Sequence, residues 1–179
     1  MLQKNKIILF LLSFSLILSC TSADSQFQIS VESSDDVIPD QISYNIEIAF
    51  IDSNITKTFI KAGRARVYNE KKETILDSGV IVNFYNDSGQ RTGVLTSTGV
   101  TIDDVSKDMF AAGNVVVVSD SIKTTLRTEV LNWRQSTRKI WTDVAVNIKS
   151  PSEIINGIGF ESNEDLSNYK IYKVTGIKQ

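Results

Sequence analysis

Strict alternation of apolar and polar residues is the feature of this sequence that most restricts its fold. The segment 139–148 places one set of side chains on a single face of an extended chain: Ile140, Thr142, Val144, Val146 and Ile148. Because successive side chains of a strand point to opposite sides, a period of two marks a strand with one buried face. The segment is therefore predicted to be a half-buried antiparallel strand.

The surrounding sequence, residues 111–150, extends this pattern into three strands separated by two polar turns. A β-branched run at 115–118 is followed by a turn at 119–121, a strand over 124–133 and a second polar break at 134–137. This succession is typical of stacked β-hairpins. We expect the rest of the chain to be organised around this unit.

Further strands are predicted on both sides of that unit. They cover 43–50, 56–68, 80–85, 93–100, 107–118, 157–162 and a last strand at 169–175. Asp/Asn/Gly clusters at 77–79 and 86–89 supply the positive-φ positions that hairpins need. No stretch shows a sustained helical period, so the prediction is an all-β sandwich, barrel or open roll.

Composition restricts the chemistry that the chain can perform. The 179 residues carry a net charge of −2, contain no His and have a single Cys at position 20, while 41% are hydrophobic. His-based catalysis, Cys–His nucleophiles, disulfides and most zinc sites are thereby excluded, and there is no electrostatic case for nucleic acid. We predict no catalytic residue, no metal site and no cofactor.

Two short motifs resemble catalytic or metal-binding patterns. Ser167 and Lys170 match the S-x-x-K spacing of serine–lysine acylases, but the segment enters a strand and lacks the accompanying elements. Asp103, Asp104 and Asp108 are close in sequence, but their spacing is not that of an EF-hand loop. We interpret the first as a chance match and the second as a solvated turn.

The N-terminus has the features of an export signal. Lys4 and Lys6 precede an apolar run at 7–18, which is shorter than the roughly 20 residues that a membrane-spanning helix needs. The sequence up to Cys20 resembles a bacterial lipoprotein signal, in which Cys20 becomes lipidated after cleavage. An uncleaved anchor with an incidental Cys is the alternative. The predicted domains are a signal peptide at 1–19, the lipidated Cys and a flexible tether at 20–40, and a β-domain at 41–179.

The order of features beyond about residue 41 resembles the LptC family, the periplasmic component of the lipopolysaccharide-export transporter, within the OstA/LptA-like β-jellyroll group. The segments that carry the resemblance are 78–85, 112–117, 128–133, 140–146 and 156–162. The resemblance implies a twisted, open, boat-like antiparallel roll with an apolar interior. Members usually have a transmembrane helix at the N-terminus, where this chain has the lipoprotein-type signal instead.

The resemblance also implies function and partners. We expect a membrane-tethered adaptor that receives lipopolysaccharide from inner-membrane transporter subunits of the LptF/LptG type and passes it to an LptA-like periplasmic bridge protein. An apolar interior suits this task, because exposing a dozen acyl methylenes to water costs roughly 10 kcal/mol at about 0.8 kcal/mol each. The expected place is the periplasmic face of the inner membrane, anchored through Cys20, with the outer membrane left open.

The hypothesis assigns residues to two sites. Side chains expected to line the lipid groove are Val82, Phe84, Val115, Val117, Ile140, Val144, Val146 and Ile148. The C-terminal docking edge comprises Tyr169, Ile171, Lys173 and Thr175, and the first strand, near residues 44–50, would face the membrane partner. Alternatives are a bridge or outer-membrane-assembly lipoprotein of the same fold, a closed hydrophobic core, and a carboxylate hydrolase for which no acid pair is evident.

Overall fold

The computed structural model describes residues 38–178. These residues form eleven strands: β1 (Gln41–Asp52), β2 (Ile55–Tyr68), β3 (Glu73–Asp77), β4 (Val80–Tyr85), β5 (Arg91–Ser97), β6 (Gly99–Asp103), β7 (Met109–Ser119), β8 (Thr125–Arg134), β9 (Lys139–Lys149), β10 (Ile154–Asn163) and β11 (Lys170–Lys178). The all-β prediction is confirmed, and the described range includes no helix that could cross a membrane. The expected signal peptide at 1–19, Cys20 and all but the end of the tether lie outside the described residues.

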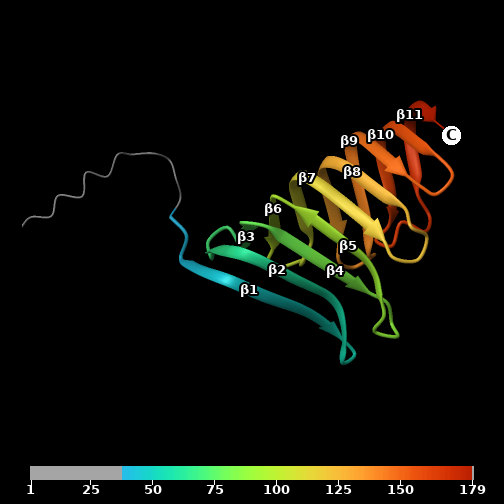
Figure 1. Ribbon diagram of the computed structural model, residues 1–179. Helices are drawn as coiled ribbons and strands as arrows, with labels where there is room; N and C mark the ends of the chain where they lie inside the picture. Colours follow the sequence, from blue (N-terminus) through green and yellow to red (C-terminus); the bar gives the residue numbers. More distant parts are fainter. Residues whose placement is uncertain (1–37, 179) are drawn as a thin grey trace, which may run out of the picture. The chain divides into compact units, whose positions relative to one another are not determined.

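The strands form one antiparallel sheet in which neighbours along the chain are neighbours in space (Figure 1). The first half of β2 pairs with β4, and its second half pairs with β3. In the same way, β7 pairs with β6 through its first half and with β5 through its second. Thus β3–β4 and β5–β6 are each two halves of one bent strand, and the sheet is a simple meander.

The bend between β3 and β4 lies at Ser78 and Gly79, whose φ angles are 62° and 87°. The positive φ values that the sequence predicted within 77–79 are present, but the hairpin is not, because β3 and β4 both run antiparallel to β2 and so continue in one direction. The positive φ values produce a bend instead. Gly63 faces it from β2, and a Cβ atom there would lie 2.6 Å from the backbone oxygen of Ser78. Only glycine leaves room for this close approach.

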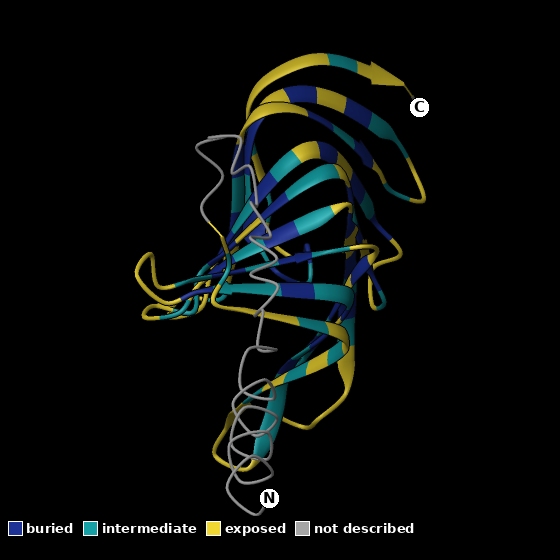
Figure 2. Ribbon diagram, turned by 90° about the vertical axis from the view of Figure 1, so that its left-hand side faces the viewer, coloured by how far each residue is buried: buried dark blue, intermediate teal, exposed yellow. Residues whose placement is uncertain are grey.

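Neighbouring strands bend at corresponding positions. In β7, Gly113 and Asn114 have φ angles of 78° and 50°, and the register with β8 shifts there. The β8–β9 and β9–β10 ladders also shift register near their middles. Such bulges bend a strand and increase its twist. Figure 2 shows successive strands curving in the same direction, so that the sheet folds into two half-sheets.

The hydrophobic core lies between these half-sheets. The rings of Phe84, from β4, and Trp133, from β8, approach to 6.1 Å although their strands are far apart in the meander. The other large, fully buried side chains come from strands between the two edge strands and include Ile60, Leu76, Leu126, Leu131, Ile140, Ile148 and Phe160. The predicted open antiparallel roll is confirmed as a single bent, open sheet.

The first and last strands of the described sheet are its edges. β1 pairs with β2 alone and β11 with β10 alone. Neither edge strand contains a buried residue. An edge strand presents unpaired N–H and C=O groups that can pair with another chain. The described roll therefore has a packed interior between two free edges.

Candidate functional site

Because each strand bends, the turns at the strand ends form two facing rims of the roll. We call the rim made by the turns after β1, β4, β7 and β9 the β4 lip. The rim made by the turns after β2, β6, β8 and β10 is the β8 lip. The interior lies between the two half-sheets, and the space between the lips is its mouth.

The structure brings together most of the side chains that the sequence assigned to the groove. Seven of them are 0–3% exposed and belong to one core cluster: Val82, Phe84, Val115, Val117, Ile140, Val146 and Ile148. They come from both half-sheets and pack against other buried apolar side chains. In the structure, these positions therefore form a continuous apolar interior.

Val144 does not belong to this interior. Its side chain is 36% exposed, and Asp143 and Ala145 beside it are exposed as well. The ladders with β8 and β10 both shift register next to this segment, so the regular alternation of β9 is interrupted at the bend. The expectation that Val144 faces inward with Val146 is corrected.

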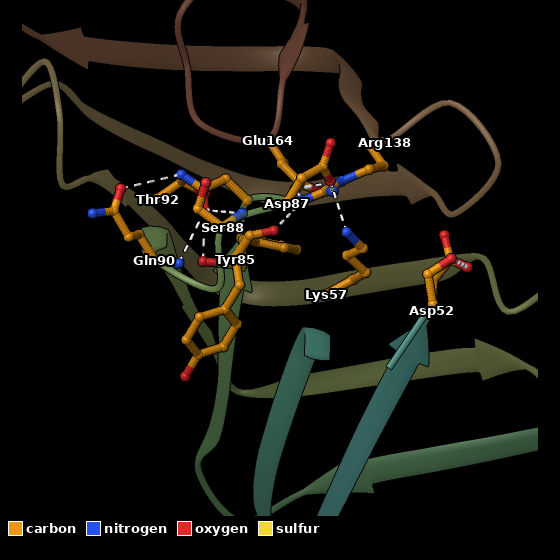
Figure 3. Close-up of polar contacts among 12 residues, drawn as sticks. Asp52, Lys57, Tyr85, Asp87, Ser88, Gln90, Thr92, Arg138 and Glu164 are labelled. Carbon is orange, nitrogen blue, oxygen red and sulfur yellow. Dashed lines mark hydrogen bonds and ion pairs between the residues drawn. The ribbon is translucent and has the colours of Figure 1, made fainter. Parts of the chain in front are cut away.

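Arg138, in the turn after β8, connects the two lips (Figure 3). Its guanidinium Nε donates to Glu164 Oε1 at 2.8 Å, and a terminal nitrogen donates to the backbone oxygen of Tyr85 at 2.5 Å. Asp87 Oδ1 lies 3.8 Å from the other terminal nitrogen and accepts from Lys57 Nζ at 2.7 Å. No other side-chain hydrogen bond or ion pair within residues 38–178 joins the β4 lip to the β8 lip.

Glu164 holds Arg138 from the β8 lip. It is 5% exposed, and its second carboxylate oxygen accepts a hydrogen bond from Trp133 Nε1 at 2.9 Å. Burial raises the pKa of the Glu164 carboxyl, although the hydrogen bonds from Arg138 and Trp133 and the charge of Arg138 oppose this. Because a buried carboxylate is costly without partners, Glu164 and Arg138 constrain each other. We call Arg138, Glu164, Trp133, Tyr85 and Asp87 the clasp.

A depression of about 300 Å³ lies over the clasp. Its walls come from both lips, with Thr92 and Asp87 on one side and Thr137, Asn163 and Asp165 on the other. Gly93 lies next to this contact, since a Cβ atom there would be 3.5 Å from the backbone oxygen of Glu164. At this point the mouth of the roll is closed by direct contact.

The predicted docking edge is exposed over most of its length. Lys173 and Thr175 are exposed and Ile171 is half-buried, whereas Tyr169 precedes β11 and stacks on Phe160 at 6.1 Å between ring centroids. Exposed apolar side chains accompany them on β11, with Tyr172, Val174 and Ile177 at 59%, 50% and 60%. The free edge is therefore partly apolar and carries lysines.

The two motifs set aside in the sequence have structural explanations. Asp103 Oδ1 accepts from the backbone N–H groups of Val105 and Ser106, which shapes the turn after β6. Asp104 accepts from the hydroxyl of Thr74. In the described part of the chain no cluster of acidic, Cys or His side chains could hold a metal ion. The S-x-x-K match spans a loop and the start of β11 rather than a helical turn.

Sequence reasoning missed the clasp. Arg138 and Glu164 lie 26 positions apart, in turns that follow different strands, and Tyr85 is 53 positions from Arg138. No local period links such residues.

An open, bent antiparallel roll with an apolar interior and free edges defines the class of LptA-like β-jellyrolls. The model of the LptC-related lipopolysaccharide-assembly family matches residues 7–178, so the chain belongs to that family. Its members are components of lipopolysaccharide transport rather than enzymes.

Comparison with solved structures supports the fold. The crystal structure of LptH from Pseudomonas aeruginosa, described as the LptA homologous periplasmic component of the lipopolysaccharide transport device, aligns with a TM-score of 0.52 at 13% identity. The alignment covers 66% of this chain and 84% of that chain. A search of curated protein sequences gives no match.

Proposed function

We propose that this protein is a membrane-tethered periplasmic adaptor of lipopolysaccharide export. It receives the lipid from inner-membrane transporter subunits, shields the acyl chains between its half-sheets and passes the lipid to a periplasmic bridge protein. Membership of the LptC-related family and the likeness to LptH support a role in this transport. The finer steps rest on the geometry of the roll.

The observation that carries the proposal is an apolar interior that extends along the sheet formed by residues 38–178, whose first and last strands are each paired on one side only. Buried apolar side chains contributed by β2 through β10 belong to one cluster. Each acyl methylene moved from water into such surroundings contributes about 0.8 kcal/mol, so several chains could not cross the periplasm unshielded. Sugars and phosphates would stay outside the mouth, where the lips are polar.

The free edges provide a way to extend the path from one protein to the next. A strand of a partner can pair with an exposed edge through backbone hydrogen bonds, while side-chain contacts give specificity. We assign β1 to the membrane partner and β11, with Ile171, Lys173 and Thr175, to the bridge protein. This arrangement would align the interiors of adjoining rolls.

Anchoring through Cys20 is part of the proposal. A lipid on Cys20 would tether the roll through the 20–40 segment and replace the transmembrane helix of other family members. Mass spectrometry of the mature N-terminus tests this, since a lipid-modified Cys20 is expected and an intact residue 1 would contradict it. Separation of the two membranes should find the protein in the inner one.

A second candidate is a bridge or outer-membrane-assembly lipoprotein with the same fold. The likeness to LptH, an LptA homologue, and the lipoprotein-type signal both favour it. Recovery of the mature protein in the outer-membrane fraction would support this candidate over the inner-membrane adaptor.

The experiment for the main proposal is purification of the full-length chain from membranes in mild detergent, followed by a lipid assay. We expect lipopolysaccharide and the transporter subunits to elute together with the protein. If the V174K/I177K double variant no longer bound the transporter subunits, their docking site would lie on β11 rather than on β1. Elution of the intact complex without lipopolysaccharide would contradict the proposal.

A further inference from the structure

The clasp joins the two lips across the mouth, and the adaptor function does not require this contact. An acyl chain that entered between the half-sheets from the side would have to pass this point. Trp133, the aromatic member of the clasp, meets Phe84 from the other half-sheet, and the two side chains are 3% and 0% exposed. Their rings are in contact range, at 6.1 Å between centroids. With the clasp closed, a lipid at the mouth cannot reach Phe84.

We propose that Arg138 is a latch and that the lips part at the clasp to admit acyl chains laterally from the mouth. The inference rests on the proposed function, and it adds the route by which the chains enter. The latch consists of the Arg138 contacts to Tyr85 and Asp87, which cross the mouth, while the contacts to Glu164 hold Arg138 on its own lip.

The strengths of the contacts suit a latch that opens. The crossing contacts are one hydrogen bond to a backbone oxygen and a 3.8 Å ion pair to Asp87, whose side chain is 88% exposed. Exposed ion pairs contribute little to stability. By contrast, the contacts within the β8 lip involve a buried carboxylate with two donors, which is costly to disrupt. Opening therefore breaks the bonds to Tyr85 and Asp87 and parts Phe84 from Trp133, while the Arg138–Glu164–Trp133 group stays intact.

The experiment joins the two lips by a covalent cross-link. Thr92 and Thr137 line opposite walls of the depression over the clasp, so the T92C/T137C variant of the full-length chain can be joined by a short bismaleimide in native membranes. The matched control is T137C/N163C, whose two positions belong to the β8 lip and leave the mouth free. The T92C and T137C single variants control for the label itself.

The readout is photo-crosslinking of lipopolysaccharide to p-benzoyl-phenylalanine in place of Phe84. Bridging T92C/T137C is expected to lower lipid labelling at least tenfold, while the treated T137C/N163C control keeps the labelling of the unbridged chain. Equal labelling in both would overturn the latch and leave the adaptor function standing. No labelling in the unbridged chain would overturn the adaptor function and the latch together.

Weakening the latch should act in the opposite direction. The R138M/E164Q variant removes the crossing contacts without stranding a buried carboxylate, and the new amide oxygen can still accept from Trp133. Lipid labelling at Phe84 is expected to rise severalfold. The control is K139M/E161Q, which removes the 2.6 Å Lys139–Glu161 pair between β9 and β10 on the same lip. A rise in the control equal to that in R138M/E164Q would contradict the latch.

Discussion

Strand β4 buries every second residue, whereas β11 buries none. A lack of apolar residues does not explain the difference, because β11 still carries Ile171, Tyr172, Val174 and Ile177. β4 has neighbours on both sides and faces Trp133 across the roll, while β11 has β10 on one side only. Apolar side chains in the middle of the roll serve its cohesion, whereas Tyr172, Val174 and Ile177 at its edge remain exposed.

The largest expected effect is a difference in the loss of stability caused by truncating a side chain in each of these two regions. F84A removes a fully buried ring and should cost about 3–5 kcal/mol of the free energy of unfolding, because the cavity cannot collapse between two half-sheets. Y172A on β11, where the side chain is 59% exposed, should change it by less than about 0.5 kcal/mol. Urea denaturation of both variants measures the comparison, and equal losses would contradict it.

A glycine pair gives the next largest contrast. G63A introduces a Cβ atom 2.6 Å from the Ser78 backbone oxygen and should cost about 1–3 kcal/mol through overpacking at the bend. G176A, in β11, meets nothing closer than 3.9 Å and should lie within about 0.5 kcal/mol of the wild type. Thermal unfolding of the two variants tests this. A neutral G63A would show that the bend is not fixed by this contact.

The clasp predicts that the stability of the middle of the roll depends on pH. Because burial raises the pKa of Glu164 in the folded state, its contribution to stability is fully present below the ordinary value of 4.5. That contribution is lost as the pH rises through the folded pKa. Relative to E164Q, the wild type should therefore become more stable as the pH falls from neutrality toward 4.5. Arg138 and Asp165 are the charges that face Glu164. If the difference in the free energy of unfolding between the two proteins did not change with pH, a buried Glu164 would be contradicted.

The smallest effect on stability is expected at the free edge. V174K/I177K places two charges on side chains that are 50% and 60% exposed, and the free energy of unfolding should change by less than about 0.5 kcal/mol. Charges on an edge strand oppose pairing with another sheet, so partner capture should be lost. If the stable variant still captured the partner, the docking site would not lie on β11.

The sequence predicted the strands well where the alternation is regular. The expected strand at 139–148 corresponds to β9, and the expected strand at 80–85 to β4, because period-two alternation depends only on local chain geometry. The turns at 86–89 and 119–121 are also present, and Asn86 Oδ1 accepts from the backbone of Ser88 and Gln90. Local chemistry was sufficient for these elements.

The sequence was less informative wherever the sheet bends. Positive-φ residues at Ser78 and Gly79 are compatible with a reversal or a bend, and the outcome depends on which strand the next segment pairs with. Val144 is turned out of the interior because register shifts in the ladders on both sides interrupt the alternation. The clasp depends on contacts between distant turns, for which a single sequence carries no periodic signal.

The measurement that tests the central claim most directly compares two positions on one strand. Val146 is 3% exposed and faces the interior, whereas Val144, two residues away, is 36% exposed. With a photo-crosslinker at each position in the membrane-bound full-length chain, the account predicts lipopolysaccharide labelling at Val146 and little at Val144. Labelling at Val144 with none at Val146 would contradict a roll that carries acyl chains between its half-sheets.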